Sequence, residues 1–154
     1  MVDQAQLKQS YRTTAIICAA IAVAPLIMLT VGFFVARADA SGLVGSGRID
    51  VLLLGVFGSL ALLPLIVVPV VRNVSAELPV NPADIRPMGA RLMMWTILEY
   101  AVWEVSSIIG LVAFILGAPG LFFIAAVVVT LQGYIRSFPK WPEWVARAEA
   151  AGRS

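Results

Sequence analysis

Two glutamates are the residues of this sequence best suited to chemistry, because both lie in a long apolar segment. Glu99 and Glu104 are the only charged residues between Leu92 and Gly117. An ionisable side chain inside a membrane costs about 2.5–3.5 kcal/mol on insertion scales, and such residues commonly have a function. The segment around these two carboxyl groups is therefore the first place to look for a site.

The spacing of the two glutamates limits what they can do together. If Arg91 marks the membrane boundary, Glu99 lies about 12 Å and Glu104 about 20 Å inside it, at 1.5 Å per helical residue. Five residues separate them, which corresponds to about 140° around a helix. They therefore do not face one site, and we do not expect acid–base chemistry by a pair of carboxylates.

Each glutamate has polar neighbours at helical spacing. Ser106 returns to the face of Glu99, and Gln132 lies at a comparable depth, so we expect a Glu99–Gln132 hydrogen bond. Glu104 shares its face with the hydroxyl-bearing residues Tyr100 and Ser107. Two roles remain open for Glu104: a protonated carboxyl group that ties two helices together, or a carboxyl group that carries a proton.

The composition identifies the solvent in which these helices must fold. The chain has 154 residues, of which 60% are hydrophobic and 13% charged. Soluble domains have about 45–50% apolar and about 25% charged residues, and a small soluble domain leaves much of its surface exposed to water. The sequence therefore predicts an integral membrane protein.

Gaps between the charged residues define four apolar segments long enough, or nearly so, for the 20 or so residues that span a hydrocarbon core of about 30 Å. The predicted spans are residues 13–36, 51–71, 92–117 and 120–138, followed by a cytoplasmic or interfacial tail over 139–154. We therefore expect an all-α membrane protein with four transmembrane helices in two hairpins. The first segment is longer than the 7–15 residues of a signal peptide core, which favours a retained helix.

The distribution of lysine and arginine predicts the orientation. Nine lie on the side of the N-terminus, the 72–91 connection and the C-terminus, and only Arg37 and Arg48 lie on the other. The positive-inside rule then places both termini in the cytoplasm, with the chain in the cell inner (plasma) membrane. Trp141 and Trp144 are expected to anchor the tail at the interface. The Ala-rich end of that tail is either a short surface helix or a frayed end.

Small residues and prolines indicate how the helices pack. Close helix approach is expected at Gly55, Gly58 and Ser59. Kinks are expected at Pro25, Pro64 and Pro69.

Several function classes are disfavoured by the residue types. The chain has no histidine, its single cysteine is Cys18 in the first apolar segment, and its net charge is +2. No nucleophile–base arrangement, nucleotide-binding loop or metal-ligand cluster can be assembled from these residues. We therefore do not expect an enzyme, a cofactor, a metal site or nucleic-acid binding.

The third apolar segment contains a motif that resembles the carboxylate helix of the proteolipid (c) subunits of rotary ATP synthases and V-type ATPases. Glu104 is followed by Ile108, Gly110 and Leu111 at the spacing of that family's acid and IYGL-type run, with Ile109 in place of the usual tyrosine. The resemblance covers about residues 51–116 and implies that Glu104 is an ion-carrying carboxylate. The family's long glycine zipper is missing, and the acid lies in the third helix and not the fourth.

Two main functions follow as expectations. The first is a proton-carrying membrane subunit similar to a proteolipid, with Glu104 reversibly protonated. The second is an accessory subunit that stabilises a larger membrane complex; a small oligomeric transporter is a third possibility. The expected partners are the lipid bilayer and other membrane subunits, or further copies of the chain.

Overall fold

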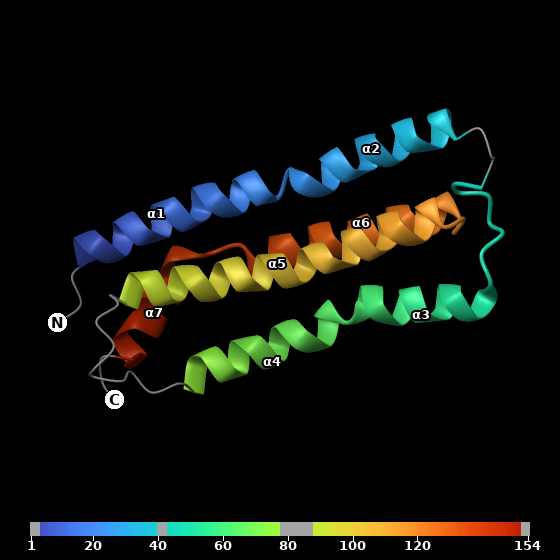
Figure 1. The fold of residues 1–154 in the computed structure, drawn as a ribbon. Helices are drawn as coiled ribbons and strands as arrows, with labels where there is room; N and C mark the ends of the chain where they lie inside the picture. The colour runs from blue at the N-terminus through green and yellow to red at the C-terminus, as the bar shows by residue number, and fades with distance from the viewer. Residues whose placement is uncertain (1–3, 40–42, 78–87, 152–154) are drawn as a thin grey trace.

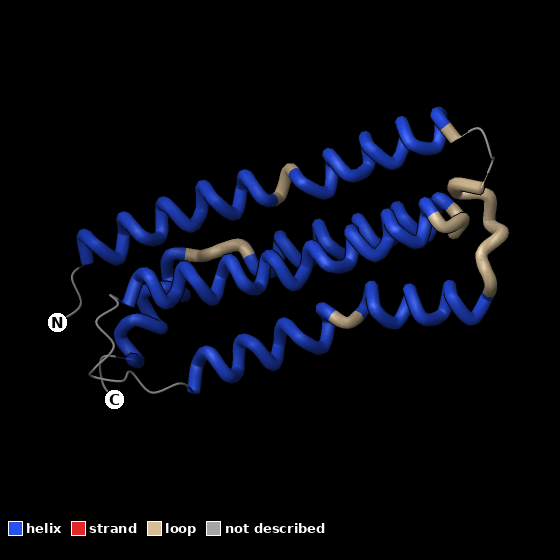
Figure 2. Tube along the Cα trace, viewed as in Figure 1, coloured by secondary structure: helices blue, strands red, loops and turns tan. Residues whose placement is uncertain are grey.

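The computed structural model describes residues 4–39, 43–77 and 88–151 (Figure 1). These residues form seven helices and no strand (Figure 2). In chain order the helices are α1 (Gln4–Ile21), α2 (Ala24–Ala38), α3 (Val51–Leu62), α4 (Pro64–Glu77), α5 (Met88–Ile115), α6 (Gly120–Ser137) and α7 (Trp141–Ala151).

Four helical spans are long and apolar enough to cross a membrane, as the sequence predicts. They are Gln4–Ala38, Val51–Val74, Met88–Ile115 and Gly120–Ser137. The first span joins α1 and α2, and the second joins α3 and α4. The first span begins at Gln4 and the third at Met88, earlier than the predicted residues 13 and 92. In both spans the helix starts before the apolar segment does.

Proline explains both breaks in the spans. α2 begins directly after the break at residues 22–23, with Pro25 in its first turn, and Pro64 is the first residue of α4. Proline is tolerated there because the first N–H groups of a helix have no partner within it. The kinks predicted at these two positions are found, whereas Pro69 lies inside α4, which continues through it.

Helix α5 is the centre of the bundle. It packs against α1, α2, α3, α4, α6 and α7. In Figure 1 the α1–α2 span and the α3–α4 span lie on opposite sides of the α5–α6 pair, and successive spans run in opposite directions. Large apolar side chains on the outer spans, such as Ile16, Phe34 and Ile66, are exposed in the isolated chain. Such a surface is suited to contact with lipid, where exposed apolar side chains are not penalised.

The closest helix approach lies between α5 and α6. A Cβ atom added at Gly110 would come within 2.5 Å of the Ala126 Cβ, and one added at Gly133 would clash with the Trp103 ring. In contrast, a Cβ at Gly55 would meet nothing within 4 Å. The close packing predicted for α3 is therefore not found within the described chain, because α3 turns these small residues outward.

Gly58 and Ser59, the other two small residues predicted to bring helices close together, also make no tight contact with a second helix. A Cβ at Gly58 would meet only the edge of the Phe122 ring, at an ordinary contact distance of 3.8 Å. Ser59 is exposed, and its hydroxyl donates to the Gly55 carbonyl at 2.9 Å within α3 itself. Neither residue brings a second helix close.

The tail forms a helix over Trp141–Ala151. α7 packs against the beginnings of α1 and α5 through a buried cluster of Leu7, Leu92, Trp144 and Ala148. The start of α1 and helix α7 lie at the same end of the bundle (Figure 1). Trp144 is only 3% exposed, so it anchors α7 to protein and not to the membrane interface, which corrects the sequence-based expectation.

Trp141 lies at the edge of this cluster. Its ring is half-buried and meets Tyr11 of α1 edge-on, with centroids 5.4 Å apart. The apolar residues of α7 recur every three or four positions, which gives the helix one face to bury. We call the packing of α7 against the N-terminal parts of α1 and α5 the end cluster.

Candidate functional site

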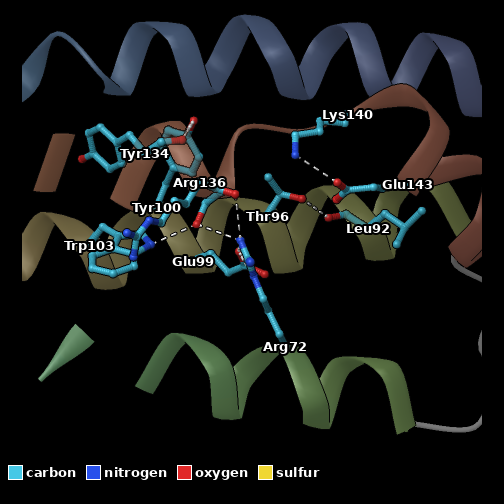
Figure 3. A network of polar contacts seen from close by, with 11 residues as sticks. Arg72, Leu92, Thr96, Glu99, Tyr100, Trp103, Tyr134, Arg136, Lys140 and Glu143 are labelled. Carbon is cyan, nitrogen blue, oxygen red and sulfur yellow. Dashed lines mark hydrogen bonds and ion pairs between the residues drawn. The ribbon is translucent and has the colours of Figure 1, made fainter. Parts of the chain in front are cut away.

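A buried ion pair joins two of the spans. The Arg72 Nε in α4 donates to a carboxylate oxygen of Glu99 in α5 at 2.8 Å (Figure 3). The Glu99 side chain is 5% exposed and that of Arg72 is 36% exposed. The negative charge is therefore buried, whereas the positive charge reaches the surface of the bundle.

The same arginine connects to the end of α6. Its Nη2 donates to the Ser137 Oγ at 3.0 Å and to the Arg136 carbonyl at 3.4 Å. Ser137 also accepts a hydrogen bond from the Trp103 indole of α5 at 2.9 Å. We call Arg72, Glu99, Trp103 and Ser137 the polar layer; it ties α4, α5 and α6 together at one level of the bundle (Figure 3).

The polar layer changes the expected environment of Glu99. Gln132, its predicted partner, is exposed on α6, and Glu99 bonds to Arg72. The sequence predicts that Arg72 begins the 72–91 connection, because a charge directly after 21 apolar residues marks a membrane boundary. The structure continues α4 through Arg72 to Glu77, which turns the arginine toward α5.

The helical segments that extend from the polar layer toward the other end of the bundle are close in length to the thickness of a hydrocarbon core. The 18 residues of α6, which ends at Ser137, span about 27 Å. From Glu99 to the end of α5 at Ile115 the length is about 25 Å, and from Val51 to Arg72 it is about 33 Å, at 1.5 Å per residue. These lengths match a hydrocarbon core of about 30 Å. On the N-terminal side of Glu99, α5 continues for eleven further residues and reaches the end cluster.

Glu104 lies in a second polar group, one and a half turns further along α5. Its carboxylate accepts hydrogen bonds from the Tyr134 hydroxyl of α6 and from the Ser107 hydroxyl, the latter at 3.3 Å. Ser107 also donates to the Glu104 carbonyl at 2.9 Å. Glu104 lies five residues beyond Glu99, which corresponds to about 7.5 Å along the axis of α5.

Tyr100 contributes to this group through Tyr134 and not through Glu104. The Tyr100 hydroxyl donates to the Tyr134 carbonyl at 3.0 Å, and the two rings stack with centroids 4.5 Å apart. Of the two predicted partners of Glu104, the structure thus brings Ser107 to the carboxylate and places Tyr100 behind Tyr134. Tyr134 was missed because its role depends on how α6 packs against α5, which spacing along one helix does not reveal.

Two further buried hydroxyls of the α5–α6 region bond to a neighbouring helix. Ser106, expected near Glu99, donates to the Ala61 carbonyl in the last turn of α3. Thr130 of α6 donates to the Trp103 carbonyl of α5 at 3.0 Å. Among the described residues, no buried side-chain nitrogen or oxygen lacks a hydrogen-bond partner.

The two carboxylates thus occupy separate sites with separate partners. Glu99 is neutralised by an arginine, whereas Glu104 is held by two neutral hydroxyls. In the described ranges there is no group of three metal-ligating side chains. The arrangement offers hydrogen bonding between helices and, at Glu104, a carboxyl group that is held by hydroxyl groups and not by an arginine or lysine.

Comparison of the chain with protein-family models, with curated proteins and with solved structures gave no match.

Proposed function

We propose that this protein is a non-catalytic membrane subunit in which α5 holds the four spans together as a rigid unit of a larger assembly. The observation that carries this proposal is the use of the polar side chains. Arg72, Glu99, Trp103, Ser106 and Thr130 all bond from one helix to another. In a bilayer, where apolar surfaces do not drive helices together, such bonds and close packing hold a bundle.

The proposed topology has two helical hairpins, with both termini and the 72–91 connection in the cytoplasm. The nine-to-two distribution of lysine and arginine supports this orientation. The plasma membrane is the proposed location. Other membrane subunits, or further copies of the chain, are the proposed partners of the exposed apolar spans.

A proton-carrying role for Glu104, similar to that of a proteolipid subunit, is the second candidate. The observation that favours it is the environment of this carboxyl group, which is half-buried and accepts hydrogen bonds from the Tyr134 and Ser107 hydroxyls. Both partners are neutral hydroxyl groups, and within the described residues no ion pair involves Glu104. A group of this kind can gain and lose a proton when a partner changes its surroundings.

The Glu104→Gln variant separates the two candidates. Glutamine keeps the volume and a hydrogen-bond acceptor, so a structural role predicts normal yield, normal melting temperature and the same co-purifying subunits in native detergent. A proton-carrying role predicts normal assembly but loss of proton-dependent activity of the complex. Loss of assembly in Glu104→Gln, with Gln132→Ala unaffected as the control, would contradict both proposals.

Carbodiimide labelling provides an independent test. The reagent modifies protonated carboxyl groups in apolar surroundings, so a proton carrier predicts modification at Glu104. Glu99 is the internal control, because its carboxylate is already paired with the Arg72 guanidinium. Proton flux through liposomes that contain only the purified protein would point to the autonomous transporter instead.

A further inference from the structure

We infer that the seam between α1 and the α6–α7 connection binds the phosphate headgroup of an anionic phospholipid. The seam carries three exposed cations: Lys8 and Arg12 on α1, and Lys140 at the start of α7. Basic side chains at the cytoplasmic end of membrane helices attract anionic lipids, with each cation near the surface contributing to the affinity.

Aromatic contacts bring the two sides of the seam together. The Tyr11 hydroxyl donates to the Pro139 carbonyl at 3.3 Å, and the Tyr11 ring meets those of Trp141 and Trp144 edge-on. Tyr11 is thus the residue of α1 that contacts the connection. Lys140 lies between Pro139 and Trp141, which both contact Tyr11, so its backbone lies beside this part of α1. Figure 3 shows its side chain directed toward Glu143.

The helical positions of Lys8 and Arg12 place both on the Tyr11 side of α1. They lie about 60° and about 100° from Tyr11 around the helix, in the same sense of rotation, at about 100° per residue. Ser10, which packs against Gly89 of α5, lies about 100° away in the opposite sense. The two cations therefore face away from α5 and along the seam.

Two of the three cations at the seam have no ion pair among the described residues, and the third has an exposed one. Within the described residues no ion pair involves Lys8 or Arg12. Lys140 pairs with Glu143 at 3.2 Å, but both side chains are more than half exposed. An exposed pair of this kind contributes little and exchanges readily with other anions.

An apolar surface directly below the seam suits the acyl chains. Ile16, one turn beyond Arg12, is 71% exposed, and Ile135 is 75% exposed. Ile135 lies on α6 one turn before Pro139, whose carbonyl accepts the hydrogen bond from Tyr11. Along their own helices, Ile16 therefore follows the cation Arg12, and Ile135 precedes the connection that carries Lys140. A phospholipid can contact both the cations and the apolar surface, whereas a free phosphate ion can contact only the cations.

Native mass spectrometry of the full chain tests this site. The probes are phosphatidylglycerol, phosphatidylcholine and inorganic phosphate, each added to protein purified in neutral detergent. We expect phosphatidylglycerol to bind in preference to phosphatidylcholine, and inorganic phosphate not to displace it. Lys8→Gln/Arg12→Gln/Lys140→Gln should weaken the preference by about fivefold for each cation removed.

A matched control removes the same number of cations elsewhere. Arg37→Gln/Arg48→Gln/Arg147→Gln takes two charges from the opposite end of the bundle and one from the exposed face of α7. It should leave the lipid preference within twofold of the unmodified protein. Equal loss in both triple variants would show a diffuse charge effect and overturn the site, as would full displacement by inorganic phosphate. If the seam triple variant does not fold, Arg12→Gln alone must still reduce the preference.

Discussion

Removal of the Arg72 guanidinium should be one of the most destabilising single charge changes in this protein. The Arg72→Gln variant leaves the Glu99 carboxylate at 5% exposure without its cation. Breaking a buried pair by removing one partner costs about 3–5 kcal/mol. Because Arg72 itself is 36% exposed, the pair is partly hydrated, and we expect the lower end, about 3 kcal/mol of unfolding free energy.

Removal of the Glu99 carboxylate should destabilise the protein less than removal of the Arg72 guanidinium, and this difference is the stricter test. In Glu99→Gln the arginine keeps its bonds to the Ser137 hydroxyl and the Arg136 carbonyl, and it can also reach water. We expect a loss of about 1 kcal/mol, similar to that of one hydrogen bond. The double variant has no unpaired charge, so the coupling energy between the two positions should be about 2 kcal/mol.

Unfolding in mixed micelles, with a denaturing detergent titrated against far-ultraviolet circular dichroism, measures these differences. The exposed Lys140–Glu143 pair is the matched control, and Lys140→Gln should cost below about 1 kcal/mol. Equal losses for Arg72→Gln and Glu99→Gln, or a coupling energy within about 0.5 kcal/mol of zero, would refute the role of burial in this argument.

Three further changes probe the packing of the bundle. Gly133→Ala should destabilise the protein by about 2 kcal/mol or more, because the added Cβ would enter the indole ring of Trp103 in α5. Gly55→Ala is the control and should change the stability by less than about 0.5 kcal/mol. Melting temperatures in detergent distinguish the two variants. Trp144→Ala should release α7 while the four spans stay folded, which limited trypsin digestion detects as faster cleavage at Arg147. Ser106→Ala should cost about 1–2 kcal/mol in the same melting assay, because a buried carbonyl of α3 loses its hydroxyl donor.

The spans could be predicted from the sequence because they depend on local properties. A gap of about 20 residues between charges is long enough for one crossing whatever its neighbours are. Likewise Pro25 and Pro64 interrupt a helix through their own missing N–H groups, and both interruptions are found. Pro69 shows the limit of this rule, because the helix around it stays continuous.

The partners of the polar residues could not be predicted in the same way. Arg72 and Glu99 are 27 positions apart, and their pairing depends on how far α4 continues beyond the apolar segment. The bond from Tyr134 to Glu104 depends on the rotation of α6 against α5, which the tight contact at Gly133 determines. Helical spacing reveals which residues share a face of one helix, but not which residue of another helix that face meets.

The position of the polar layer bears on the choice between the two proposed functions. If Arg72 and Glu99 lie at the slab edge, the midplane is about 15 Å deeper, which corresponds to about ten residues along α5. That position falls near Ile109, while Glu104 lies only about halfway to it. A carboxyl group that transfers ions at the midplane would need to lie a turn or more further along the helix. At the depth of Glu104, a hydrogen bond to Tyr134 that fastens α6 to α5 is the simpler use of the side chain, and the non-catalytic subunit is therefore the better supported proposal.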